Sequence, residues 1–577
     1  MSAFKTTILG ASLLALTACG TAEKISPEAL ITTPQGPVQG VSTDDDTIYN
    51  FKGVPFAAPP IGNLRWAAPT PAPKWSEAHM ASAFGNRCMQ PSDVEGGFFT
   101  RLIEGHGLGT IKNFLIKRAV ASQKPSPMSE DCLYLNVRSG NIGSGTKQPV
   151  IVWIHGGGHQ IGSGDFDYYQ SNALPKKDVV LVTINYRLGA MGYMAHPALS
   201  KTDPNGVSGN YGTLDQIAAL QWVKDNISAY GGDPDNVTIF GESAGSWSVT
   251  ELMASPLAKG LFHKAIGQSG ASSYHLGQME GEGVGWPSGY QTGSRVAAAL
   301  GFEAPTAEEL RAVPADKLQS IITEQMSEGF HHIRDGYVFP ENVGLAFAKG
   351  TYNKVPMLFG YNSDEGTLFF PDDPQPTVWL PDTKPGSKAE LTTQLSKAFP
   401  ANGGQLVDLY NLDTDFANGG TQLMGDEIFG VNIRYVARQN ETQGESSYLY
   451  YFSRIPPSKK QTLGAFHAAE IPFVFGSYET ILGQSKEDEA LAELMQNYWV
   501  NFAKTGNPNG DGLPGWPMHK GEHWMHLTAN TGERSEPTMH IRKDKIDALE
   551  EGLLVKLKAL ETALNPQQNA GAIAAPN

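Results

Sequence analysis

Continuous apolar runs recur through the middle and later parts of the chain. The clearest occupy residues 149–154, 178–184, 236–240, 354–360 and 447–452. Such runs are typical of strands that are buried on both faces of a parallel sheet. Between them, residues 214–227 and 244–254 have apolar side chains at helical spacing. The alternation predicts an α/β fold in which helices cover both faces of a large, mostly parallel sheet.

The two ends of the chain have other patterns. Residues 38–41 and 47–54 flank a polar turn and predict a hairpin. Residues 55–73 are rich in proline and predict irregular surface chain, because proline does not fit a helix interior or a central strand. Residues 543–564 predict a closing amphipathic helix, and the small and polar residues 565–577 predict a disordered tail.

The first residues predict an export signal. A short apolar run follows Lys5, and it is too short to span a bilayer, so we expect residues 1–18 to be a cleaved signal peptide. Leu16-Thr17-Ala18-Cys19 resembles a bacterial lipobox. That resemblance implies acylation of the Cys19 thiol and a tether over residues 19–30. An ordinary signal peptide that happens to contain a cysteine is the alternative. Gly20, where an aspartate would indicate inner-membrane retention, favours an outer-membrane lipoprotein facing the periplasm or the cell surface.

Charge and cysteine content limit the partners and the cysteine chemistry expected of this protein. The 577 residues include 59 Asp and Glu against 43 Lys and Arg, a balance that argues against a nucleic-acid partner. Cleavage before Cys19 would leave two further cysteines, Cys88 and Cys132. In an exported chain these indicate either one disulfide or two free thiols. Neither lies in a Cys/His arrangement that would suggest catalysis. No feature of the sequence predicts an oligomeric state.

The strongest chemical motif is Gly241-Glu242-Ser243-Ala244-Gly245. It follows an apolar strand and begins a helix, which is the context of a nucleophile elbow with Ser243 as nucleophile. The turn is so sharp that residues two before and two after the serine must be small. A similar stretch, Gly267-Gln268-Ser269-Gly270-Ala271, lacks the second glycine and a following helix, so we interpret Ser269 as structural or pocket-lining.

A serine nucleophile needs a general base and an acid that orients the base. In α/β-hydrolases these follow the serine in the order acid, then histidine, on loops after later strands. Asp364 and Glu365 follow one predicted strand, and His467 follows another. An oxyanion hole is predicted in His155-Gly156-Gly157-Gly158, because glycines let backbone N–H groups approach the developing oxyanion. No Gly-Lys-Ser/Thr follows these glycines, which excludes a phosphate-binding P-loop.

Together these segments resemble the type-B carboxylesterase/lipase family, which includes the cholinesterases. Further matching stretches begin at Phe51, Leu64, Ser129, Asn185, Gly209, Ala503 and Trp516, and the resemblance covers roughly residues 30–545. It implies a single α/β-hydrolase catalytic domain, here over residues 31–564, and a Ser243–Glu365–His467 triad. It also implies oxyanion donors at Gly157, Gly158 and Ala244, a Cys88–Cys132 disulfide, and no metal or organic cofactor.

The sequence departs from the family pattern in two places. Residues 89–131 lack the tryptophan expected of a quaternary-ammonium site, so a choline ester is a doubtful substrate. His159 follows the glycines where the family usually has an aromatic residue; it either packs or places a polar group beside the acyl pocket. Residues 89–131 are interpreted as a lid or as a cover of the core. We expect His331 and His332 on the surface rather than in the pocket.

The function predicted from the sequence is hydrolysis of carboxylic esters through an acyl-enzyme, with an ester and water as substrates. Short- to medium-chain or aryl esters, including xenobiotic or mycotoxin esters, are the expected class. The alternatives are a non-catalytic binding or adhesion relative, and a lipase or amidase with the same triad. The membrane is expected as a partner only through a lipid at Cys19.

Overall fold

The fold is taken from a computed structural model, which describes most of the chain. The described residues are 23–43, 47–91, 98–105, 126–274, 277–279, 288–325, 330–369, 386–455, 461–477, 485–520 and 522–564. Within them no helix is both long enough and apolar enough to cross a bilayer.

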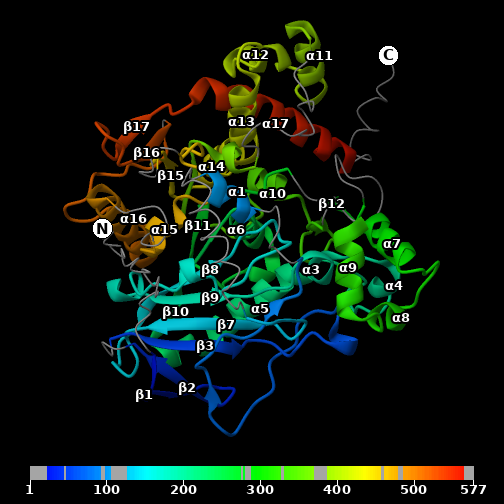
Figure 1. The fold of residues 1–577 in the computed structure, drawn as a ribbon, viewed down its shortest axis with the longest axis vertical. Coiled ribbons are helices and arrows are strands. Elements are labelled where there is room, and N and C mark those ends of the chain that lie inside the picture. The colour runs from blue at the N-terminus through cyan, green and yellow to red at the C-terminus, as the bar shows by residue number, and fades with distance from the viewer. Residues whose placement is uncertain are drawn as a thin grey trace, which may run out of the picture.

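A single large sheet runs through the described part of the molecule (Figure 1). Its strands, in spatial order, are β1 (Lys24–Thr32), β2 (Pro37–Ser42), β3 (Tyr49–Pro55), β7 (Tyr134–Ser139), β9 (Val180–Ile184), β8 (Gln148–Ile154), β10 (Gly232–Glu242), β11 (Lys264–Gln268), β14 (Met357–Asn362), β15 (Ser447–Phe452), β16 (His523–Leu527) and β17 (Glu536–Met539), and β4 (His79–Met80) joins β2. Strands from β9 to β16 are parallel, and those at both ends are antiparallel.

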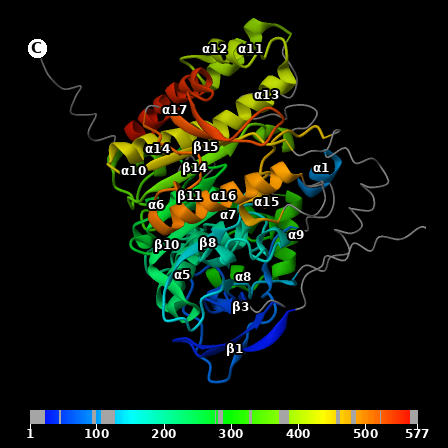
Figure 2. The same cartoon turned by 90° about the vertical axis from the view of Figure 1, so that its left-hand side faces the viewer.

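The central strands are apolar on both faces because both faces are covered by helices (Figure 2). In β8, Val150 and Val152 enter one core cluster, whereas Ile151 and Trp153 enter the other. The first cluster includes residues of α5 (Tyr211–Asn226), α6 (Ala244–Ala254), α10 (Val343–Lys349), α14 (Val431–Thr442) and α17 (Lys543–Leu564), and the second includes residues of α15 (Ile471–Phe475) and α16 (Lys486–Thr505). Successive side chains of β8 therefore still alternate between the two faces of the sheet, but the side chains on both faces are apolar.

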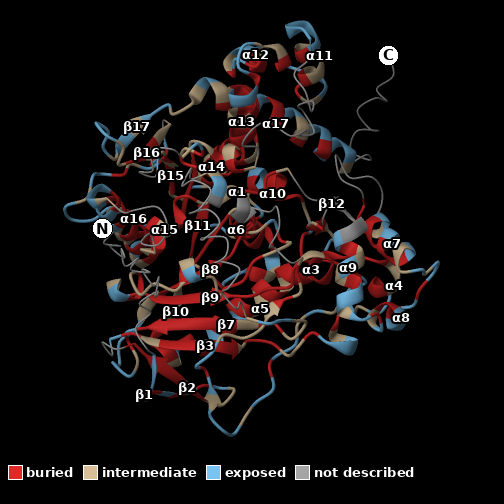
Figure 3. Cartoon of the chain, viewed as in Figure 1, coloured by how far each residue is buried: buried red, intermediate tan, exposed pale blue. Residues whose placement is uncertain are grey.

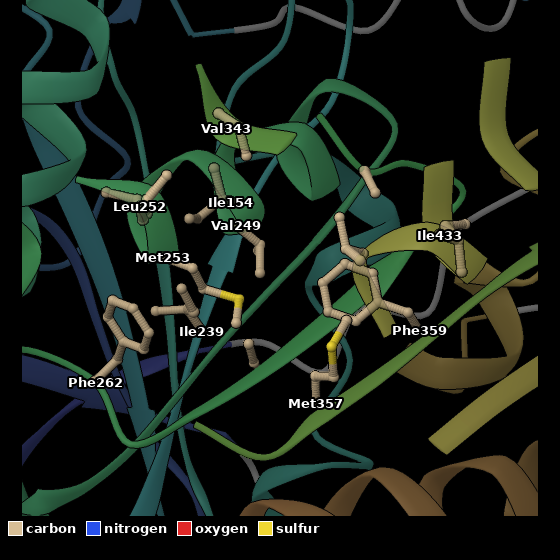
Figure 4. Close-up of a cluster of buried hydrophobic side chains, with 14 of the residues drawn as sticks. Ile154, Ile239, Val249, Leu252, Met253, Phe262, Val343, Met357, Phe359 and Ile433 are labelled. Atoms are coloured by element: carbon tan, nitrogen blue, oxygen red, sulfur yellow. The ribbon is translucent and has the colours of Figure 1, made fainter. Parts of the chain in front are cut away.

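The core is continuous from the sheet into α6, which follows the nucleophile (Figures 3 and 4). Ile154 of β8, Ile239 of β10 and Leu252 of α6 are fully buried in one cluster. Burial of each such side chain contributes about 1.5–3 kcal/mol to stability. This packing fixes α6 against the ends of β8 and β10, and so fixes the turn between β10 and α6.

Smaller elements surround the sheet. They are α1 (Phe98–Gly105), α3 (Gly189–Tyr193), α4 (Pro197–Ser200), α7 (Gly289–Ala299), α8 (Ala307–Arg311), α9 (Ala315–Gln325), α11 (Lys388–Ala398), α12 (Gly403–Leu409) and α13 (Phe416–Gly425), with the strand pairs β5 (Arg87–Cys88)–β6 (Met128–Ser129) and β12 (Gly277–Gln278)–β13 (Ile333–Arg334). The expected disulfide is present: Cys88 and Cys132 are bonded.

Most predicted elements are confirmed, and one boundary is wrong. The five apolar runs form β8, β9, β10, β14 and β15, the hairpin forms β2 and β3, and the closing helix is α17. The tether expected over residues 19–30 is too long, because residues from Lys24 onward form β1 and pair with β2. The predicted signal peptide, Cys19 and the tail at 565–577 lie outside the described residues.

Candidate active site

The turn that carries Ser243 is as sharp as the glycine spacing predicts. Ser243 has φ 56° and joins the last residue of β10 to the first residue of α6. A Cβ added to Gly241 would lie 2.5 Å from the carbonyl carbon of Gly245. A Cβ added to Gly245 would lie 2.0 Å from the carbonyl oxygen of Ile154. Neither position can hold a larger residue, so the need for small residues on both sides of the serine is confirmed.

The glycine loop after β8 lies directly beside Ser243. Strands β8 and β10 are neighbours, with Ile154 paired to Gly241. A Cβ added to Gly156 would lie 3.0 Å from the Cβ of Ser243. In the described part of the chain, the amides of Gly157, Gly158 and Ala244 have no hydrogen-bond acceptor. Three unpaired N–H groups beside a serine hydroxyl are what an oxyanion hole requires.

The acid and the base come from two adjacent parallel strands. Glu365 follows β14, His467 follows β15, and a bridge between Asp364 and Phe466 holds the two loops together. Nδ1 of His467 lies 2.6 Å from Oε2 of Glu365. Asp364 instead accepts the backbone N–H of Ala465 at 2.9 Å. The acid beside His467 is therefore Glu365, and Asp364 shapes the loop.

A second carboxylate reaches the other nitrogen of the imidazole. Nε2 of His467 lies 3.0 Å from Oε1 of Glu242, the residue before the nucleophile. Among the described residues no hydrogen bond joins His467 to Ser243. Burial by itself lowers the pKa of His467, but the two carboxylates outweigh it and raise that pKa above its usual value. Burial raises the pKa of Glu242, and the nearby imidazole opposes this change.

A third buried carboxylate, that of Glu470, bonds to the last residues of β11 and β14. Glu470 accepts hydrogen bonds from Nε2 of Gln268 at 3.0 Å and from Nδ2 of Asn362 at 2.6 Å. Burial raises the pKa of this carboxyl group. Sequence reasoning missed Glu242 and Glu470. Glu242 lies inside the serine motif and could have been found there, whereas nothing in the pattern around Glu470 distinguishes it.

Two phenylalanine rings contact the imidazole of His467. Phe429 is stacked on His467 at 4.9 Å between ring centroids, and Phe369 lies 5.0 Å away at an angle of 46°. Phe429 belongs to a single π-helical turn, η7 (Asp426–Gly430), between α13 and α14. Such turns occur frequently at functional sites because they redirect a side chain within a helix. The two rings restrict the orientation of the imidazole and keep water from part of its surface.

The whole arrangement can be compared with known proteins. The sequence profile of the Carboxylesterase family matches residues 27–547. The chain belongs to the carboxylesterase family. This carboxylesterase is 35% identical over 531 residues to the fumonisin B1 esterase of Sphingopyxis macrogoltabida, which covers 89% of this chain and 88% of that protein. It is 34% identical to the para-nitrobenzyl esterase of Bacillus subtilis (strain 168), over 85% of this chain and 93% of that protein.

Solved structures agree with the sequence comparison. A carboxylesterase of Geobacillus stearothermophilus superimposes with a TM-score of 0.74 at 31% identity, covering 90% of this chain and 100% of that one. The fold is therefore the α/β-hydrolase fold, and the protein is a carboxylic-ester hydrolase. The fold class, the family and the enzyme class predicted from the sequence are all confirmed.

Three further sequence predictions concern residues around the site of this carboxylesterase. Ser269 is buried and no helix follows it, which agrees with a structural role. The surface position expected for His332 is wrong: its side chain is buried beside His159, because the chain passes inward before β13. Of residues 89–131, helix α1 ends against the loop before His467, with the N–H of Thr462 bonded to the carbonyl of Gly105. Much of that loop lies outside the described residues, so the lid stays a prediction.

Proposed function

We propose that this carboxylesterase hydrolyses its ester through an acyl-enzyme on Ser243, with His467 as general base and Glu365 as the acid that orients it. The observation that carries the proposal is the convergence of three features: Ser243 at the elbow, unpaired amides beside it, and the bond between His467 Nδ1 and Glu365. A carboxylate on Nδ1 fixes the tautomer that leaves Nε2 free to accept a proton.

The proposed steps use only these groups and water. Nε2 of His467 accepts the hydroxyl proton as Ser243 Oγ attacks the ester carbonyl, and the amides of Gly157, Gly158 and Ala244 stabilise the oxyanion. The tetrahedral intermediate expels the alcohol, which takes its proton from His467. Water then attacks the acyl-enzyme with His467 again as base, and the acid leaves. For the first step Nε2 must turn from Glu242 toward Ser243, since catalytic hydrogen bonds often form fully only with substrate bound.

We propose short- to medium-chain and aryl esters as substrates, with xenobiotic and mycotoxin esters among them. The aromatic rings of Phe369 and Phe429 beside His467 support an apolar, ring-accepting site. The names of two relatives, a para-nitrobenzyl esterase and a fumonisin B1 esterase, also support this class.

The test compares p-nitrophenyl acetate, butyrate and palmitate as substrates of the wild type and of Ser243→Ala. We expect the wild type to prefer the short chains and the variant to lose at least about a thousandfold in kcat. Equal rates in the two proteins would remove Ser243 from the mechanism. Preference for palmitate would favour a lipase. Hydrolysis of the matching anilide would favour an amidase. If folded wild type hydrolyses none of these substrates, a binding protein is favoured.

We also propose that the protein is exported and anchored by a lipid at Cys19, in the outer membrane. The support is the short apolar run after Lys5 and the lipobox-like Leu16-Thr17-Ala18-Cys19. Metabolic labelling with an alkyne fatty acid should label the wild type and not Cys19→Ala, and the labelled protein should fractionate with outer membranes. Unlabelled wild type of full activity in the soluble periplasmic fraction would contradict the anchor and leave the esterase assignment unaffected.

A further inference from the structure

Three side chains that the proposed reaction does not use meet beneath the oxyanion loop. His159 directly follows the two oxyanion glycines, Glu251 lies on α6, and His332 lies just before β13. All three side chains are buried, with 2–4% of each residue exposed. One ligand atom of each lies within 4.8 Å of those of the other two. Three segments far apart in sequence thus bring two imidazoles and a carboxylate to one point.

In the described structure the carboxylate of Glu251 faces imidazoles rather than a lysine or arginine. No lysine or arginine forms an ion pair with this carboxylate there. Its Oε2 lies 2.9 Å from Nε2 of His332, and apart from this contact neither atom has a hydrogen-bond partner there. A buried carboxylate without a counter-charge is costly and must either hold a proton or face a cation.

We propose that His159, Glu251 and His332 form a binding site for a divalent transition metal of the zinc class. Two imidazole nitrogens and one carboxylate oxygen are a ligand set that Zn²⁺ uses in proteins. A divalent ion would balance the charge of Glu251 and occupy both unpartnered atoms. Burial lowers the pKa of both histidines.

The distances require only a small adjustment. Ligand atoms on a tetrahedral zinc ion lie about 3.3 Å apart, given metal–ligand bonds of about 2 Å. The ligand atoms of Glu251 and His332 are already 2.9 Å apart, so it is the ligand atom of His159 that must move closer to the other two. The rings of His159 and His332 are 4.4 Å apart between centroids and nearly perpendicular. A side-chain shift of at most about 1.5 Å, the difference between 4.8 Å and the spacing of about 3.3 Å on zinc, would bring the three atoms to bonding positions.

The surroundings supply the outer hydrogen bonds that metal ligands need. The hydroxyl of Ser248 lies 2.9 Å from Nε2 of His159 and accepts a hydrogen bond from Gln216. The Ser272 side chain lowers the pKa of Glu251, against the effect of burial. The ring of Tyr193 lies 4.6 Å from that of His332 and, with Phe339, closes the cluster from the side. Three protein ligands leave the fourth position of a tetrahedral ion for a water molecule, and the ion would link the oxyanion loop to the helix that follows Ser243.

The experiment measures metal binding by the full-length protein and by variants. Apo protein is prepared with chelator, incubated with micromolar Zn²⁺, freed of excess and analysed by mass spectrometry for metal content. We expect one zinc ion per chain, a melting temperature several degrees higher with zinc, and visible absorption of tetrahedral Co²⁺ after cobalt replaces zinc. Glu251→Gln and His332→Asn keep side-chain shape and should each reduce affinity at least tenfold. His523→Ala, which changes a half-buried histidine on β16, should bind one ion like the wild type.

Circular dichroism and urea unfolding establish that each variant is folded. Folded wild type with no stoichiometric zinc would overturn the proposal and leave a shared proton between Glu251 and His332 as the charge balance. Stoichiometric zinc retained with unchanged affinity in folded Glu251→Gln and His332→Asn would also overturn it, since the ion would then lie elsewhere. These readouts do not depend on ester hydrolysis, so they fail or succeed independently of the proposed mechanism.

Discussion

Nε2 of the His467 imidazole lies 3.0 Å from Oε1 of Glu242. In the proposed mechanism Nε2 accepts the serine proton, and Nδ1 already contacts Glu365. The resting site thus places one imidazole between two buried carboxylates, an environment that favours the imidazolium ion. Substrate hydrolysis requires the neutral ring, so the contact with Glu242 has consequences for the pH dependence of the enzyme.

The first prediction concerns that pH dependence. Because the carboxylates raise the pKa of His467, the neutral base is lost as pH falls through the raised value. We expect kcat/KM for p-nitrophenyl acetate to fall on the acid side with an apparent pKa above the ordinary histidine value of about 6.5. Glu242→Gln removes one negative charge and should move this limb to lower pH by about one unit or more. Glu441→Gln is the remote control and should leave the profile unchanged. If Glu242→Gln does not move the acid limb of the pH profile, the electrostatic role of Glu242 is contradicted.

The second prediction separates the two carboxylates of the site. Glu365→Gln keeps the shape of the side chain but presents an amide to Nδ1, which favours the wrong imidazole tautomer. We expect kcat to fall by roughly 10⁴, as for an amide replacing the acid of a catalytic triad. Stopped-flow or steady-state assays measure the loss, and Glu441→Gln, a glutamate beside His519, should stay within twofold of wild type. A loss below tenfold in Glu365→Gln would mean that another group orients the base.

The third prediction tests the oxyanion loop. Gly157 has φ 101°, and an added Cβ would lie 2.2 Å from the carbonyl oxygen of Ile161. Gly157→Ala must therefore move the loop and its N–H donors, and we expect kcat to fall by about 100- to 1,000-fold. Gly143→Ala is a matched control, because Gly143 also has positive φ but an added Cβ there meets nothing within 4 Å. Equal activity of the two variants would show that the loop does not bind the oxyanion.

The fourth prediction concerns stability. The disulfide between Cys88 and Cys132 closes a chain separation of 44 residues. In the chain-entropy account such a closure stabilises the fold by about 4 kcal/mol. The double variant Cys88→Ser/Cys132→Ser should unfold at lower denaturant concentration than the wild type, by an amount that corresponds to this value. Fluorescence-monitored urea unfolding gives the comparison, and the wild type in reducing agent should follow the variant. Coincident unfolding curves for oxidised and variant protein would refute the assigned stabilisation.

The sequence predicted the site well where chemistry constrains short segments. The serine motif and the glycine loop are local, because an elbow and an oxyanion loop need particular small residues at fixed positions. The order of residues along the chain limited the candidates for the base and the acid. Spacing alone did not decide whether Asp364 or Glu365 is the acid. The structure separated them, since Asp364 bonds to Ala465 and Glu365 reaches His467. A difference of one residue in a loop decides which side chain turns inward, and periodicity does not contain that information.

The sequence was less informative about short or mixed strands and about buried polar groups. Strands β7 and β11 were not predicted, because β7 mixes polar with apolar residues and β11 is only five residues long. His332 was expected on the surface, because a histidine pair beside charged residues is typical of exposed chain. It is buried beside His159 and Glu251, which are distant from it in sequence.

By itself, the sequence determined the α/β class, the family and the positions of the glycines that surround Ser243, the proposed nucleophile. Each of these depends on local pattern: apolar runs that match strands, and small residues where a turn leaves no space for a side chain. Only the tertiary structure decided that Glu242 contacts the catalytic imidazole, that Phe429 stacks on it, and that His159, Glu251 and His332 meet. Such contacts join segments tens to hundreds of residues apart, and they exist because strand order and helix packing place those segments side by side.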